Sequence, residues 1–188
     1  MAGVDVSYDR GSPVLYAAVV VLDARTAEPI EATGVRARAS FPYVPGYLSF
    51  RELPAALEAF ERLRHRPDLV VCDGHGQAHP RCFGLASHLG VWLDLPSIGC
   101  AKSVLIGRYR DPGVRRGCHT RLRANGETIG EAVRTRDGVK PVFVSVGHRV
   151  SLPTARRWVL ELARGFRLPE TTRAAHREVN RLRSCDKV

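Results

Sequence analysis

The sequence predicts a single α/β domain in which helices flank a mixed β-sheet. Residues 1–39 read as three successive strands, and the later segments alternate between strand and helix patterns. The chain of 188 residues has the size of one domain, and its 44% hydrophobic content is enough for a sizeable core. We therefore expect one domain over residues 1–188, with a basic C-terminal tail at 170–188.

The N-terminal segment predicts an antiparallel meander. A short strand over 3–8 leads through the turn formers of 9–13 into an apolar strand over 15–22. After a break at 27–29, residues 30–39 alternate small or apolar side chains with arginines, which is typical of a strand with one solvated, basic face. Three strands in sequence therefore form one side of the sheet.

A stiff loop at 41–54 follows the meander. Pro42 and Pro45 fix φ on either side of Tyr43 and Val44, and each restricts the residue before it to an extended conformation. A rigid aromatic tip loses little entropy when it enters a partner, as a wedge between stacked bases must. The alternative is an ordinary surface turn.

Helix and strand patterns alternate through the rest of the chain, punctuated by glycine and proline. We expect a helix from near Glu52 to a stop at Pro67, a strand over 68–73, a short helix over 82–89 capped by Gly90, a strand over 91–100 interrupted by Pro96, a loop over 107–117, a hairpin of 118–123 and 128–133 around Asn125-Gly126, a strand over 141–146, a helix over 152–163 capped by Gly165, and one loosely held helix with a frayed end within 167–188.

Composition limits the classes of function. Lys and Arg total 29 against 19 acidic residues, and the net charge of +10 favours a polyanionic partner, although such charge can also serve solubility alone. The longest apolar run, 15–22, is far shorter than the roughly 20 residues of a membrane span, and nothing resembles a signal peptide, so we expect a cytoplasmic protein without membrane contact. The five cysteines lack a Cys-x-x-Cys pair and suggest neither a disulfide framework nor a zinc site.

Three carboxylates are candidates for one metal site. Asp5 lies within an apolar strand, Asp73 ends a buried strand, and Glu52 stands at the expected helix start. If they converge, a hard divalent cation such as Mg²⁺ would make the arrangement tolerable. Each also has a structural explanation: Asp5 on an edge strand, Asp73 in an Asp-Gly turn, and Glu52 in a capping box with Ser49.

Two further side chains could assist at such a site. Lys102 follows a strand and could stabilise charge on a phosphate, or it could simply be solvated; no Walker-type glycine motif precedes it. His148 follows the strand at 141–146 and could position water or carry a proton, or could bond a backbone carbonyl. The histidines near Asp73 lack the spacing of a zinc hydrolase.

Six ordered sequence blocks together resemble the bacterial endonuclease V family, the deoxyinosine-directed repair nucleases. The resemblance extends to about residue 170. The blocks are GVDVS (3–7), PYVPGYLSFRE (42–52), DGHGQAHPR (73–81), GLASH (84–88), IGCAKS (98–103) and GHRVS (147–151).

This resemblance implies an RNase H-like fold and hydrolysis of the second phosphodiester on the 3′ side of deoxyinosine, with Mg²⁺ as cofactor and Mn²⁺ able to replace it. Its partner would be damaged DNA, bound by a monomer. The matching residues are Asp5, Glu52 and Asp73 as metal-binding acids; Lys102 and His148 as catalytic partners; Pro42, Tyr43, Val44 and Pro45 as the wedge; Gly46, Leu48, Gly74, Gly76, Gly84 and Leu85 as the base pocket; and His79 and Arg81 as phosphate contacts.

The chain departs from the family pattern in two places. Members usually carry a helical segment before the first strand, whereas Asp5 here is four residues from Met1. Arg81-Cys82 stands where the family commonly has two arginines, which removes one expected phosphate contact.

Two alternative functions remain. One is an endoribonuclease acting on inosine-containing RNA. The other is a damage-binding protein without turnover, although such a protein would have no use for acids that face a polyanion.

Overall fold

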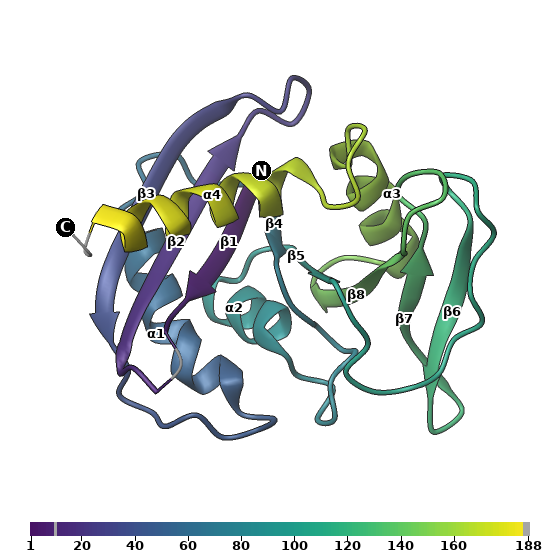
Figure 1. The fold of residues 1–188 in the computed structure, drawn as a ribbon, viewed down its shortest axis with the longest axis horizontal. Coiled ribbons are helices and arrows are strands. Elements are labelled where there is room, and N and C mark those ends of the chain that lie inside the picture. Colours follow the sequence, from purple (N-terminus) through teal and green to yellow (C-terminus); the bar gives the residue numbers. More distant parts are fainter. Residues whose placement is uncertain (10, 186–188) are drawn as a thin grey trace.

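A mixed β-sheet with helices on both faces forms the fold (Figure 1), as the sequence predicts. The computed structural model describes every residue except 10 and 186–188. The strand order is β3-β2-β1-β4-β5-β8-β7-β6, and β1, β4 and β5 run parallel to one another. The strands are β1 (Ala2–Ser7), β2 (Val14–Leu22), β3 (Pro29–Arg38), β4 (Val70–Cys72), β5 (Ser97–Ala101), β6 (His119–Ala124), β7 (Glu127–Val133) and β8 (Val142–His148); the helices are α1 (Leu48–Glu61), α2 (Leu85–Leu93), α3 (Leu152–Leu162) and α4 (Glu170–Cys185).

Strand β2 is apolar throughout because helices cover both of its faces. Successive side chains of a strand point to opposite faces. On one face, α1 covers Leu15, Ala17, Val19 and Val21; on the other, α4 covers Tyr16, Ala18, Val20 and Leu22.

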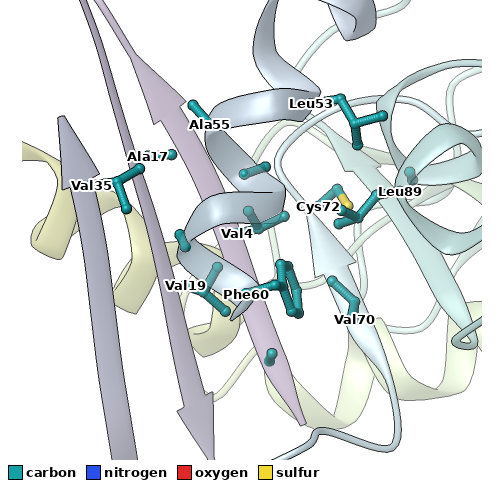
Figure 2. Close-up of a cluster of buried hydrophobic side chains, with 14 of the residues drawn as sticks. Val4, Ala17, Val19, Val35, Leu53, Ala55, Phe60, Val70, Cys72 and Leu89 are labelled. Carbon is teal, nitrogen blue, oxygen red and sulfur yellow. The ribbon is translucent and has the colours of Figure 1, made fainter. Parts of the chain in front are cut away.

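The main core lies between the sheet and helices α1 and α2. Phe60 of α1 and Leu89 of α2 pack with Val4, Val19 and the other inward residues of β1, β2 and β4 (Figure 2). This packing fixes α1 over the end of β1, where the candidate carboxylates lie.

The structure corrects the predicted bounds of α1. The helix begins at Leu48, before Glu52, and ends at Glu61, six residues before Pro67. Pro54 therefore lies inside it, so the apolar contacts of the buried face outweigh the one amide that proline cannot donate. Ser49 is within the helix and the N-cap is Tyr47, so the alternative of a Ser49–Glu52 capping box is wrong.

Helix α2 also differs from its prediction. It covers Leu85–Leu93, not 82–89, and Asp94, at φ 48°, ends it. Gly90 lies inside the helix, where a Cβ atom would come within 2.1 Å of Ser97 Oγ. The glycine is there for close packing of α2 on β5, and the predicted strand 91–100 shortens to Ser97–Ala101 accordingly.

The C-terminal half contains one confirmed turn and one corrected helix. Asn125 and Gly126 have φ of 51° and 82°, as the predicted β6–β7 hairpin requires. The predicted basic tail is an integral helix: α4 packs across β1 and β2 (Figure 1) and buries Thr171, Ala175 and Val179. The expected frayed end falls at 186–188, outside the described residues. None of the described helices is long and apolar enough to cross a membrane.

Candidate active site

Two adjacent parallel strands bring Asp5 and Asp73 together. Val4 of β1 is aligned with Cys72 of β4, so the next residue of each strand, an aspartate, stands at the same level. Val4 and Cys72 point into the core beneath α1, which turns Asp5 towards the opposite face, where α4 lies. The prediction that both acids lie at one sheet edge therefore agrees with the register.

Lys102 follows β5, the next strand along the sheet, and reaches the same place. Its Nζ donates to Asp73 Oδ2 at 2.5 Å. The Lys102 side chain is 44% exposed, so its remaining N–H groups face solvent beside the carboxylates. An ammonium in this position can contact an anion that approaches the two aspartates.

Glu52 of α1 is buried close to the two aspartates. Burial, followed by repulsion from Asp5 and then from Asp73, raises the pKa of Glu52 to about 8, against an opposing effect of Arg51. Burial and the Asp73 charge also raise the pKa of Asp5, while a hydrogen bond from His176 acts in the opposite direction. These three carboxylates, called here the acidic cluster, are close enough that the charge of Asp73 opposes the ionisation of Asp5 and of Glu52.

The chemistry of the acidic cluster fits a hard divalent cation. In the described part of the chain, no group of three His, Cys, Asp or Glu side chains already forms a ligand cage. Instead, Asp5 lies within hydrogen-bond distance of His176, and Asp73 is paired with Lys102. Mg²⁺ needs one or two protein carboxylates and takes water and phosphate oxygens for its other positions, so the two aspartates meet its requirement.

His176 is a site residue that the sequence analysis missed. Its Nδ1 lies 2.8 Å from Asp5 Oδ2, and its Nε2 lies 3.0 Å from Asn180 Nδ2, one helical turn further along α4. The other site residues lie in glycine-rich segments or at the ends of predicted strands. His176 lies in a basic, polar helix that has neither feature. The available signal was the i, i+4 pair of polar residues His176 and Asn180, beside the buried Ala175 and Val179 of the same helix.

The structure places His148 away from the acidic cluster. It pairs with Ser97 at the start of β5, whereas Lys102 follows the end of that strand, so the two residues lie at opposite edges of the sheet. Its Nε2 lies 3.0 Å from Asp94 Oδ1, beside Arg149. The predicted association of His148 with the acids is therefore wrong. Because β8 runs antiparallel to β5, its last residue, His148, lies where β4 and β5 begin, whereas the acids lie where they end.

The predicted wedge loop stands beside the acidic cluster with its aromatic tip in solvent. Tyr43 is 60% exposed and, with Tyr8 and Arg51, lines a cavity of 730 Å³. The buried Arg51 guanidinium donates to Phe41 O at 2.9 Å and to Ser12 O at 2.8 Å, which anchors the base of the loop to the β1–β2 turn. Pro42, Val44 and Pro45 flank the tip at the surface.

The glycines of the predicted base pocket differ in what they do. A Cβ at Gly76 would lie 2.0 Å from Val146 O, and one at Gly84 would lie 2.3 Å from His75 O, so both allow close backbone packing. Gly46 has a φ of +79°, and Gly74 leaves open space beside Leu85. Leu48, at the start of α1, is partly buried.

The two predicted phosphate contacts are engaged within the protein. His79 is buried, and burial followed by the charge of Arg81 lowers its pKa. Arg81 Nη1 donates to Gly46 O at 2.9 Å, and its guanidinium lies 3.8 Å from the centre of the Tyr47 ring. In this arrangement Arg81 fastens the wedge loop to the loop after β4.

Comparisons with known proteins agree with this geometry. A family model described as Endonuclease V matches residues 1–177. Endonuclease V of Roseiflexus sp. (strain RS-1) is 57% identical over 175 residues, covering 93% of this chain and 78% of the relative. The crystal structure of endonuclease V from Streptomyces avermitilis superposes with a TM-score of 0.96 at 50% identity, over 100% of this chain and 82% of that one.

A more distant structure contains nucleic acid. Ciona intestinalis endonuclease V, in complex with a 24mer DNA containing an inosine followed by a ribo-adenosine, matches with a TM-score of 0.83 and 27% identity, over 97% of this chain and 84% of that one. The RNase H-like fold expected from the sequence is therefore confirmed.

Proposed function

This chain belongs to the endonuclease V family, and we propose that it is a metal-dependent endonuclease that recognises deoxyinosine in DNA and hydrolyses the second phosphodiester on its 3′ side. The observation that carries the proposal is the acidic cluster: Glu52 is buried, burial and mutual repulsion raise the pKa values of Glu52 and Asp5, and a bound cation would favour their ionised forms. The net charge of +10 supports a nucleic-acid substrate.

Asp5 and Asp73 would hold a divalent cation, for which we propose Mg²⁺ with Mn²⁺ as a substitute, and Glu52 would complete the site directly or through water. When bound, such a cation activates a water molecule and neutralises charge on the phosphate. Lys102, already beside Asp73, contacts a non-bridging phosphate oxygen. His176 fixes the orientation of the Asp5 carboxylate through its Nδ1.

Glu52 supplies a group that can hold a proton at neutral pH. Its pKa of about 8 keeps the carboxyl protonated until a cation or a change of pH releases the proton. The burial that raises this pKa also excludes bulk water from its side of the cluster.

Recognition of the base is assigned to the wedge and the adjoining loops. Tyr43 fills the space left by the displaced base, while Gly46, Leu48, Gly74 and Leu85 line the pocket that receives it, with Gly76 and Gly84 shaping its backbone. Extracting a base costs a few kcal/mol and costs least where pairing is weak, as it is for hypoxanthine.

A second candidate substrate is inosine-containing RNA. The Ciona complex favours it, because the nucleotide after inosine in that ligand is a ribonucleotide. A single donor or acceptor near the 2′-hydroxyl would be enough to distinguish the two substrates.

The test is incubation of the purified protein with a 5′-labelled duplex that carries one deoxyinosine, with and without Mg²⁺, next to an adenine control and the matching RNA. We expect Mg²⁺-dependent cutting of the inosine strand at the second linkage on its 3′ side. Cutting of the RNA alone would favour the second candidate. Binding without cutting under any divalent metal would contradict the nuclease proposal.

A further inference from the structure

A second group of cations lies beyond Lys102 on the same edge of the sheet. There, where β5 ends and β8 begins, a cavity of 550 Å³ is lined by residues that include Lys102, Tyr109, Lys140 and Arg167. Lys140 lies two residues before β8, so it comes to this edge from the strand next to β5. None of the residues predicted from sequence other than Lys102 lines this cavity.

Arg167 holds the backbone of both lysines. Its Nη2 donates to Lys102 O at 2.6 Å and to Pro141 O at 2.8 Å, and its Nε donates to Lys140 O at 3.0 Å. One guanidinium therefore fixes the two points from which the lysine side chains leave the backbone. Side chains that start from fixed points bind a ligand with less loss of conformational entropy.

A second arginine, Arg134, fixes another part of the cavity lining. Arg134 is buried; it donates to Gly113 O at 3.1 Å, to Pro112 O at 2.7 Å and to Asp111 Oδ2 at 3.0 Å. Asp111, the acid in this part of the lining, is therefore already paired and does not neutralise the lysines. Among the described residues, no carboxylate lies within ion-pair distance of Lys140, which is exposed.

An aromatic side chain stands in the same cavity. Tyr109 is 39% exposed and packs edge-to-face on Phe143, with ring centres 5.0 Å apart. A cationic wall beside an exposed aromatic ring is typical of surfaces that follow single-stranded nucleic acid, where phosphates meet the cations and a base stacks on the ring.

The order of the strands places this cavity on one side of the acidic cluster, away from the wedge. The wedge cavity lies beside β1. Going along the sheet from there, each strand brings one residue to this edge: Asp5 from β1, Asp73 from β4, Lys102 from β5 and Lys140 from β8. Neighbouring strands are about 4.8 Å apart, so the path from β1 to β8 is on the order of 14 Å, the length of a few nucleotides. A strand whose lesion lies at the wedge would pass the acidic cluster and then enter the cavity.

We propose that this cavity binds the sugar-phosphate backbone of the cleaved strand on the 3′ side of the cut, with Lys140 contacting a phosphate and Tyr109 stacking on a base. The inference rests on the proposed function, because the direction follows from cutting on the 3′ side of the lesion. It adds a substrate-binding subsite that holds the 3′ product and sets how much single strand the enzyme needs beyond the cut.

The test uses inosine-containing single strands whose 3′ arm beyond the cut is either one nucleotide or several nucleotides long. Lys140→Ala should raise KM for the long-armed substrate severalfold, leave kcat unchanged, leave KM for the short-armed substrate unchanged, and reduce the slope of log affinity against log salt by about one. Tyr109→Ala should also weaken the long-armed substrate selectively. Arg157→Ala, which removes an exposed charge on the outer surface of α3, is the matched control and should change neither substrate.

A phosphate-deletion experiment locates the contact. A single neutral methylphosphonate placed in the 3′ arm should weaken binding by the wild-type protein but not by Lys140→Ala, because both changes remove the same contact. Equal losses for long and short arms, or additive effects of the two changes at every position, would overturn the subsite. Failure of the wild-type protein to cut any inosine strand would instead refute the proposed function, so the two failures are distinguishable.

Discussion

The two edges of the sheet carry similar residues in opposite electrostatic states. At one edge, Asp94 accepts hydrogen bonds from His148 and Arg149, and these partners lower its pKa. At the other edge, burial raises the pKa values of Asp5 and Glu52. Both edges combine carboxylates with a histidine and a basic side chain, but only at the second edge does burial favour the protonated carboxyl over its charged form.

This difference shows what distinguishes a candidate site from a surface ion pair. The Asp94 side chain is 68% exposed, and exposed pairs contribute little to stability. In the acidic cluster, burial and mutual repulsion instead disfavour the ionised forms of Asp5 and Glu52, and carboxylates perturbed in this way are typical of functional sites. Residue type alone does not separate the two edges; burial and charge balance do.

The largest expected effect separates the two edges directly. Asp73→Ala should lower cleavage of an inosine strand about a thousandfold or more, because it removes a cation ligand and the partner of Lys102, while inosine-DNA binding is partly retained. Asp94→Ala, the control from the opposite edge, should leave the rate within about twofold. Single-turnover rates and gel-shift affinities measure both. Undiminished cleavage by Asp73→Ala would remove the metal assignment.

A pair of histidines sharpens the comparison. His176→Ala should lower kcat by about tenfold to a hundredfold, since Asp5 loses the group that orients it. His148→Ala should be nearly silent, because its partner is Asp94. The reverse ranking of the two variants in the same cleavage assay would restore His148 to the site and contradict the present assignment.

Two exposed aromatic residues give the next contrast. Tyr43→Ala should reduce the preference for inosine over adenine by about tenfold while cutting persists, because stacking in the displaced base's place is lost. Trp92→Ala is the matched control, because Trp92 is 67% exposed near the end of α2; this substitution should leave the preference for inosine over adenine unchanged. An unchanged inosine-to-adenine ratio in Tyr43→Ala would count against the wedge.

The smallest effect concerns stability and pH. Because the pKa of Glu52 in the folded protein is about 8, above the ordinary 4.5, the folded state binds more protons than the unfolded state between these values, and stability falls as pH rises through them. The measurement is the melting temperature at neutral pH and at about pH 9, with a chelator present to remove metal. Over this range the melting temperature of the wild-type protein should fall on the order of 5 °C more than that of the Glu52→Gln variant.

Comparing the two proteins isolates Glu52, since the other titrating groups are common to both. Added Mg²⁺ should reduce the loss in the wild-type protein, because a bound cation favours the ionised cluster. Parallel curves for the two proteins without metal would mean that Glu52 titrates normally and is not buried among charges.

The local patterns of the sequence determined much of the fold. Alternation and turn residues located the meander and the β6–β7 hairpin, since strand periodicity and a type I′ turn depend on neighbouring residues alone. The predicted boundaries were wrong where packing overrides propensity: α1 contains Pro54, and α2 contains Gly90. The C-terminal helix looked loosely held because its few small apolar residues do not reveal that the backbone at Thr171 packs directly on Gly3 of β1.

The sequence by itself determined that Asp5 and Asp73 end or interrupt buried strands, that Tyr43 sits between two prolines, and that the chain is strongly basic. Only the tertiary structure decided which side chains meet. The register of parallel β1 and β4 sets the two aspartates level, the course of α4 brings His176 to Asp5 across 171 positions of sequence, and antiparallel β8 carries His148 to the far edge. Such meetings depend on strand order and direction, which arise from packing between distant segments and leave no local mark in the chain.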